Sequence, residues 1–284
     1  MSNEYQSHGI KMSSASSLKG SIATHPENSS SFPHRIRDVF PPGLDSSCST
    51  RGARGHYTLA PGQLHRTLTS CYGPEKHVDS IVVKSAWYGR QSKLAKQEFI
   101  VLRVEDLEID GLTNYLVLDR TTSTPSSVFS GLIPHSRLRF QGEMARDAFK
   151  IAYDGNVGQL LQECNLSPHK YLERLDFKPE ESLLLYQLST LVYIISERYP
   201  QFRVADINGS GFAGLAWECM REIRPSASHT HLDQGAKKRG KLGWIHPAPD
   251  SVEVTEICQL FHKEALAVTM ELSKQKSIWA TVSS

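Results

Sequence analysis

The sequence lacks a long apolar run and an export signal. Its most apolar window, residues 183–195, is shorter than the ~20 residues that cross a bilayer, and it contains Gln187, Ser189 and Thr190. The N-terminus has no continuous apolar segment of the kind found in secretory signal peptides. These two absences predict a soluble protein that is neither secreted nor anchored in a membrane.

The sequence also lacks a cysteine framework and an excess of charge of either sign. Its five cysteines, an odd number with no CxxC pair, indicate reduced intracellular thiols rather than disulfides or a zinc ribbon. Lys and Arg number 32 against 30 acidic residues, for a formal net charge of +2. This balance argues against a nucleic-acid partner, because such binders carry a clear basic surplus. We expect a cytoplasmic protein, and the short basic run at 237–241 leaves a nuclear location open.

Residues 1–76 differ in composition from the rest of the chain. Ser, Pro, Gly and Thr dominate this stretch, and its isolated apolar residues follow neither a helix nor a strand period. Such a segment buries too little apolar surface to offset the entropy lost on ordering. The sequence therefore predicts a disordered arm over 1–76 and a single α+β domain over 77–284.

The first part of that domain has a strand pattern. Residues 81–88 and 98–104 are rich in β-forming side chains, and in the second segment apolar residues alternate in position. Asp110-Gly111 is a turn signal, after which residues 114–121 resume the β pattern. We predict a three-strand antiparallel meander over about 80–121.

From about residue 142 onward the apolar period becomes helical. Met144 and Ile151 recur at helical spacing, and residues 180–198 form the strongest helical pattern in the chain. The last segment, from 252 to about 275, has the pattern of a long amphipathic helix. The predicted fold class is therefore α+β, with the meander followed by a helical C-terminal half. Cysteines within these helical patterns are interpreted as small buried hydrophobic residues: Cys164, Cys219 and Cys258.

Residues 209–214 read GSGFAG, a literal GxGxxG between a β-like segment and a predicted helix. In a dinucleotide site these glycines let the pyrophosphate approach the N-terminus of the helix. That fold requires further parallel strands after the motif, and the remaining sequence shows none of this kind. The start of a helix therefore explains the glycines better than a cofactor site does.

A candidate metal site is contained in the pentapeptide His229-Thr230-His231-Leu232-Asp233. It resembles the HxHxDH zinc motif of metallo-β-lactamase-fold hydrolases, in which the imidazoles hold one zinc and the Asp helps to hold a second. Gln234 stands where that family has its final His. The resemblance implies a zinc-dependent hydrolase with His229, His231 and Asp233 as ligands, and the alternative is an exposed polar loop.

A second resemblance is based on Glu98-Phe99, the strand NYLVLDR that ends at Arg120, and Phe212-Ala213. This order resembles a group of basidiomycete fungal proteins marked by His-Glu-Phe at a strand start and by Asn-Cys-Tyr-Trp-Phe-Ala at a helix start. That group is in turn similar to the circularly permuted papain-like fold of NlpC-type peptidases and lecithin:retinol acyltransferase-like proteins. The resemblance implies a thiol nucleophile at a helix N-terminus and a histidine base on a strand.

At the chemical positions of that family this sequence differs. Gln97 stands where the His is expected and Gly209 where the Cys is expected, whereas Asn208 matches and Asp119 is placed to orient the base. Glutamine is no general base near neutral pH and glycine offers no nucleophile. The resemblance thus implies a degenerate site without catalytic residues.

Two functional hypotheses follow from the sequence. The favoured one is a catalytically inactive papain-like domain that binds or scaffolds an unidentified protein partner and needs no cofactor. The alternative is a metal-dependent hydrolase that uses zinc at His229, His231 and Asp233.

Overall fold

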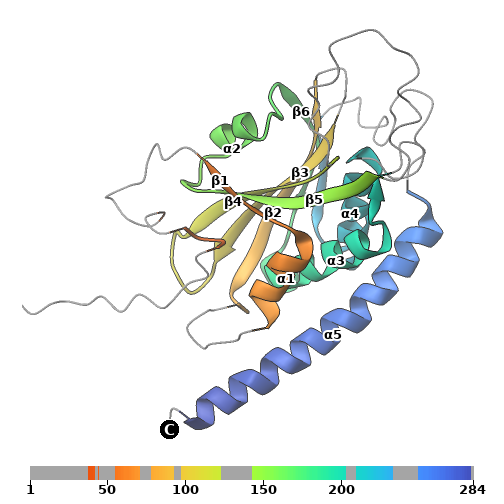
Figure 1. Ribbon diagram of the computed structural model, residues 1–284. Coiled ribbons are helices and arrows are strands. Elements are labelled where there is room, and N and C mark those ends of the chain that lie inside the picture. Colours follow the sequence, from red (N-terminus) through yellow and green to blue (C-terminus); the bar gives the residue numbers. More distant parts are fainter. Residues whose placement is uncertain are drawn as a thin grey trace, which may run out of the picture. The chain divides into compact units, whose positions relative to one another are not determined.

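The core of the protein is an antiparallel sheet combined with α-helices (Figure 1). The computed structural model describes residues 38–41, 44, 55–70, 78–92, 97–122, 143–202, 209–232 and 249–282. Within them the strands are β1 His56–Leu59, β2 Ile81–Gln91, β3 Glu98–Asp106, β4 Thr113–Thr122, β5 Glu143–Ala152, β6 His169–Asp176, β7 Leu183–Leu184, β8 Gln201–Phe202 and β9 Ser228–His231. The α-helices are α1 Pro61–Thr69, α2 Val157–Glu163, α3 Leu185–Arg198, α4 Gly209–Ile223 and α5 Ser251–Val282, and a short 3₁₀ turn covers Pro179–Glu181.

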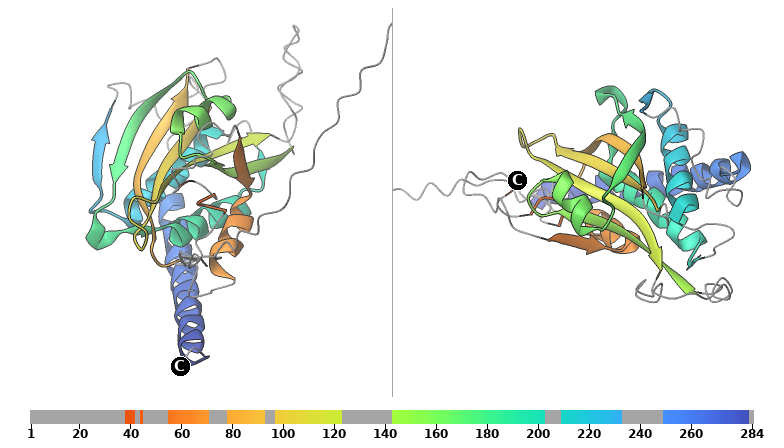
Figure 2. Two further views of the ribbon diagram at one scale, coloured as in Figure 1. Left: turned by 90° about the vertical axis from the view of Figure 1, so that its left-hand side faces the viewer. Right: turned by 90° about the horizontal axis from the view of Figure 1, so that it is seen from above.

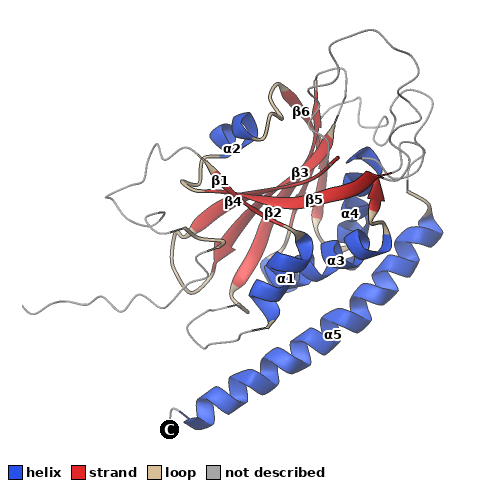
Figure 3. Cartoon of the chain, in the orientation of Figure 1, coloured by secondary structure: helices blue, strands red, loops and turns tan. Residues whose placement is uncertain are grey.

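The described strands, red in Figure 3, form one sheet. Their order is β1-β5-β4-β3-β2-β6-β9, with β7 paired to β2 and β8 to β5. The predicted meander at 80–121 is confirmed as β2, β3 and β4, which are antiparallel neighbours. Between β3 and β4 the chain turns at Gly111, whose φ of 74° lies in the left-handed region that favours glycine. The α+β class is thereby confirmed.

Different helices cover the two faces of the sheet. Because side chains alternate along a strand, Ile100 and Leu102 of β3 point to one face while Phe99 and Val101 point to the other. Helices α1, α3, α4 and α5 lie over the first face, hereafter the α4 face, and α2 lies over the second, hereafter the α2 face (Figures 1 and 2). The larger apolar core lies under the four helices.

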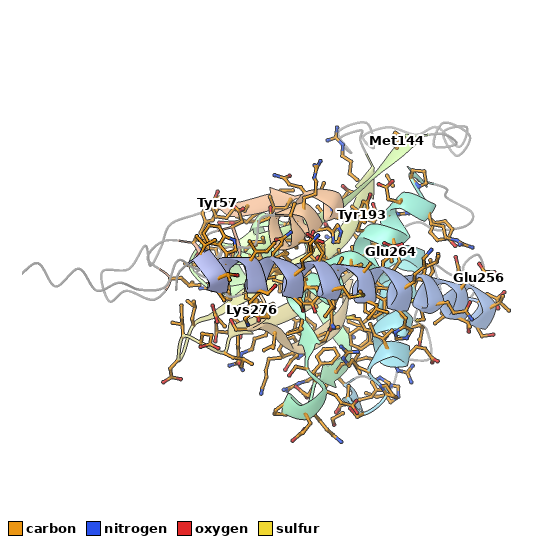
Figure 4. All side chains as sticks on the ribbon, turned by 90° about the horizontal axis from the view of Figure 1, so that it is seen from below. Tyr57, Met144, Tyr193, Glu256, Glu264 and Lys276 are labelled. Carbon is orange, nitrogen blue, oxygen red and sulfur yellow. The ribbon has the colours of Figure 1, made fainter. Side chains whose placement is uncertain are left out.

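Helix α5 extends beyond both predicted ends of that helix. It buries a stripe of apolar side chains at i, i+3 and i+4 spacing, and packs against α3 and α4: Val254, Ile257, Cys258, Phe261, Ala265 and Leu272. In Figure 4, Glu256 and Lys276 mark positions toward opposite ends of this helix. Near the C-terminal end, Lys276 Nζ lies 2.8 Å from the carboxylate of Asp79. None of the helices among the described residues has the length and apolarity needed to cross a membrane.

The predicted arm over 1–76 is wrong for residues 55–70, which form β1 and α1. Strand β1 pairs with β5, and Leu64 and Leu68 of α1 are buried in the core against α3. One pair of apolar residues four positions apart is too short a pattern to reveal a helix in the sequence. Val39 and Phe40 are also fully buried. Apart from residues 38–41, 44 and 55–70, the residues of the predicted arm lie outside the described part of the chain.

The helical pattern predicted from residue 142 is also corrected. Residues 143–152 form β5, which lies between β4 and β1. Phe149 and Ile151 point into the large core and Lys150 points to the opposite face, so the apolar period is two rather than 3.6. Strands β6 and β9 likewise lie in the half of the chain predicted to be helical.

Candidate metal centre

Strand β9 brings its two histidines to one face at the edge of the described sheet. His229 and His231 are two positions apart, so both side chains project to the same side. β9 pairs with β6 so that His231 lies opposite Glu173 and His229 opposite Leu175. Leu175 belongs to the core of the α4 face, and the three polar side chains therefore share that face. In the left view of Figure 2, β9 is the short blue strand beside the green β6.

The donor atoms of Glu173, His229 and His231 converge. One nitrogen or oxygen atom from each residue lies within 4.8 Å of the others. His229 Nε2 is 2.8 Å from Glu173 Oε2, and the two imidazole rings have centroids 4.5 Å apart. The side chain of Glu173 is 3% exposed and that of His229 is 20% exposed, whereas His231 is exposed to solvent. The carboxylate of the cluster is thus buried, and the imidazole of His231 is exposed.

Helix α4 supplies a donor that orients this carboxylate. Trp217 Nε1 donates a hydrogen bond of 3.1 Å to Glu173 Oε2, and the indole is fully buried. Its ring lies 6.4 Å from the ring of His229. A buried carboxylate requires hydrogen-bond partners to offset its lost hydration. Trp217 and His229 provide such partners and hold Glu173 in one orientation.

A second buried carboxylate lies behind this group. Tyr88 is the β2 neighbour of Glu173 in the sheet, its ring centroid is 5.4 Å from that of Trp217, and its hydroxyl donates to Glu98. Arg90 Nε donates to the same carboxylate over 2.8 Å. Glu98, one of the residues that carries the fungal-family resemblance, is therefore part of a buried ion pair beneath α4.

A cavity of about 460 Å³ adjoins the cluster. His229 lines it, as do Glu218 of α4, Arg224 after α4 and Val254 of α5. The imidazole of His229 therefore borders both the converging donors and a space large enough for a small molecule or several waters.

The structure replaces part of the ligand set expected from the sequence. His229 and His231 lie together as predicted, Asp233 lies outside the described residues, and Glu173 is the acidic group that the fold brings to them. Glu173 is 56 residues from His229 and belongs to another strand. The one available signal was its position two residues before Leu175, which places both side chains on one face of a strand, where an acid beside an apolar residue requires a partner.

Gln97 and Asp119 form a separate group on the α2 face. Gln97 Nε2 donates to Asp119 Oδ2 over 3.0 Å, and Lys150 Nζ lies 2.7 Å from the same oxygen. Burial raises the pKa of the fully buried Asp119 carboxyl, and Lys150 opposes that rise. The Gln97 amide and Lys150 Nζ thus hold Asp119 in place, and an amide is no general base near neutral pH.

The helix that begins at Gly209 packs on the opposite face. Phe212, in its first turn, lies under the guanidinium of Arg120 at 4.5 Å, and Arg120 is the β4 residue next to Asp119. Consecutive strand residues point to opposite sides, so the sheet lies between the Gln97–Asp119 pair and α4. Asn208 lies outside the described residues. The structure therefore brings Gln97 and Asp119 of the expected degenerate site together, and it places the helix that begins at Gly209 on the other face of the sheet.

Comparison of the chain with protein-family models, with curated proteins and with solved structures found no match.

Proposed function

We propose that the protein binds zinc through Glu173, His229 and His231 and is a metal-dependent hydrolase. The observation that carries this proposal is the convergence of the three donor atoms within 4.8 Å. Two imidazoles and one carboxylate are ligands that zinc accepts in a tetrahedral site. Three protein ligands leave one position open, as in catalytic zinc centres.

Each residue has a distinct part in such a centre. The imidazoles of His229 and His231 supply neutral nitrogen ligands, and the carboxylate of Glu173 supplies an anionic oxygen that offsets part of the cation's charge. Zinc lowers the pKa of a bound water to about 7, which provides a nucleophile near neutral pH. His229 borders the cavity of about 460 Å³, so a substrate bound in that cavity would lie beside one of the three proposed ligands.

The other hypothesis, a catalytically inactive papain-like binding domain, has less support. Its described positions do not share one face, because Gln97 and Asp119 lie on the α2 face and the helix that begins at Gly209 packs on the α4 face. The Gln97 amide and Lys150 Nζ both contact Asp119, and these contacts are consistent with a group that stabilises the fold. No contact of this pair identifies a binding partner.

Metal titration of the untagged, chelator-treated protein tests the proposal. We expect one equivalent of zinc to bind, and cobalt(II) to give the visible spectrum of a tetrahedral site. Glu173→Gln, His229→Ala and His231→Ala should each weaken binding at least about tenfold, because each removes a ligand. His262→Ala, which changes an exposed histidine of α5, is the matched control and should bind as the wild type does.

Two results would count against the proposal. Less than about a tenth of an equivalent of zinc retained at micromolar concentrations would exclude the metal centre. If Asp233→Asn lowered the zinc affinity as much as His229→Ala does, Asp233 would be a fourth protein ligand. The open position needed for hydrolysis would then be absent.

A further inference from the structure

Two cysteines are in contact where α4 and α5 pack together. Cys219 of α4 is 0% exposed and Cys258 of α5 is 4% exposed. Cys258 Sγ lies 4.0 Å from the backbone carbonyl oxygen of Cys219. The contact joins residues 39 positions apart in the chain, on two helices that share one apolar core. The pair is therefore produced by tertiary packing rather than by a local sequence motif.

The two thiols are not equivalent. The interaction with the Cys219 side chain lowers the pKa of the Cys258 thiol, and this effect outweighs burial and the nearby Glu222, which both raise it. The same interaction, together with burial and the carboxylates of Glu253 and Glu222, raises the pKa of Cys219. Because the thiolate is the reactive form, Cys258 is the better nucleophile of the two.

Cys164 provides a contrast within the same chain. Burial raises the pKa of its thiol to about 12, and the influence of Lys150 only partly opposes this effect. The interactions that act on Cys164 come from Lys150, Asp119 and Glu163, and no second thiol is among them. Among the described cysteines, mutual thiol contact thus distinguishes Cys219 and Cys258.

We infer that Cys219 and Cys258 are a dithiol site that a peroxide converts reversibly to a disulfide between α4 and α5. In the first step the Cys258 thiolate attacks one peroxide oxygen, the O–O bond breaks, and the second oxygen leaves as hydroxide and is protonated to water. In the second step the Cys219 sulfur attacks the sulfenic acid, an S–S bond forms, and the S–O bond breaks to release water. The two thiols lose two electrons and hydrogen peroxide is reduced to two waters.

The location gives the disulfide a structural consequence. Trp217, which holds Glu173, lies two residues before Cys219 on α4, and Val254 of α5 lines the cavity one turn before Cys258. A covalent bond at this point would fix the contact between the two helices beside the candidate metal centre. The inference itself does not depend on metal binding.

The experiment uses the full chain with Cys48, Cys71 and Cys164 replaced by serine, so that only the pair remains. Circular dichroism first establishes that this variant melts as the wild type does. After treatment of the folded protein with hydrogen peroxide, we expect the intact mass to fall by the mass of two hydrogen atoms. Peptide mapping should then show a Cys219–Cys258 cross-link that dithiothreitol removes, and the melting temperature should be higher in the oxidised form.

A matched control carries the additional change Cys258→Ala. It should show no loss of two hydrogens under the same treatment, because Cys219 then has no partner thiol. The inference would be overturned if the two-cysteine variant kept both thiols, or formed sulfinic acid, under conditions that fully oxidise glutathione in the same tube. If the three serine changes alter the melting curve, the same mapping is done on the wild-type chain, where a cross-link other than Cys219–Cys258 would equally overturn it.

Discussion

Trp217 is the single residue that links most parts of the candidate centre. Its indole nitrogen donates to Glu173, its ring contacts Tyr88, and its side chain is fully buried in α4. Hydrogen bonds from such outer groups fix the orientation of a ligand and tune its affinity for a metal. Trp217 is therefore a positioning residue, because it touches the ligand and not the cation.

Trp217→Phe should weaken zinc binding by about 10- to 100-fold, since it removes the donor to Glu173 while keeping an aromatic ring. Metal titration measures the effect, and Trp87→Phe, on the α2 face beneath Arg174, is the control that should leave affinity unchanged. In a Glu173→Ala background, Trp217→Phe should add no further loss, because it acts through the carboxylate. Equal zinc affinity of Trp217→Phe and the wild type would contradict the positioning role.

At the scale of single residues, the sequence identified two of the three residues of the candidate centre. The spacing of His229 and His231 is visible in the chain, because two side chains at i and i+2 share a face of any strand. Glu173 could not be assigned, since the pairing of β6 with β9 joins positions far apart in the sequence. The expected site at Gln97, Asp119 and Gly209 assumed a common face that the sheet does not provide.

Among the elements, α4 accounts for the GxGxxG sequence as the start of a helix. The GxGxxG sequence at 209–214 lies within the first turns of the helix rather than in a loop before it. A β-carbon at Gly214 would lie 3.6 Å from the Tyr88 hydroxyl oxygen and 3.6 Å from Pro249, which is ordinary van der Waals contact. A β-carbon at Gly89 of β2 would lie 2.6 Å from the ring of Phe99. The structure therefore has room for a side chain at Gly214 but not at Gly89.

Gly214→Ala should raise the free energy of unfolding by about 0.5–1 kcal/mol, because alanine restricts the unfolded chain and favours the helix. Gly89→Ala should lower it by about 1–3 kcal/mol, because the methyl group displaces the Phe99 ring. Urea denaturation followed by circular dichroism measures both changes. Destabilisation by Gly214→Ala would show that the space beside Tyr88 is smaller than the structure indicates.

Prediction of elements from the sequence depended on the length of each pattern. The meander β2–β4 and helix α3 were identified because their apolar periods extend over many residues. β5 was assigned to a helix because Met144 and Ile151 fit that period, although Phe149 and Ile151 alternate with Lys150 across the sheet. Over so few apolar residues, helix and strand periods cannot be distinguished by spacing alone.

For the whole molecule, the N-terminal residues are structurally more important than their composition suggests. Val39, Phe40, Leu64 and Leu68 are 0–1% exposed and belong to the same core as β2, β3 and α3. Asn114 of β4 donates a hydrogen bond of 2.6 Å to the carbonyl of Val39, which ties that segment to the sheet. The described core therefore begins well before the predicted boundary at 77.

A chain that begins at residue 77 should not fold stably, whereas one that begins at residue 38 should. Loss of one buried Leu typically costs about 2–5 kcal/mol, and removal of four large buried side chains approaches the whole stability of a domain, about 5–15 kcal/mol. Circular dichroism melts and limited proteolysis of the two chains measure the difference. A cooperative, wild-type-like melt of the chain from 77 would contradict the assignment of α1 and β1 to the core.

The sequence by itself determined the α+β class, the meander, the long helices and the histidine pair, because periodicity and side-chain alternation are local properties of the chain. Tertiary structure alone decided that residues 55–70 join the core, that Glu173 meets His229 and His231, and that Asp119 and α4 lie on opposite faces. The physical reason is that strand order, helix packing and the burial of polar groups depend on contacts between distant residues.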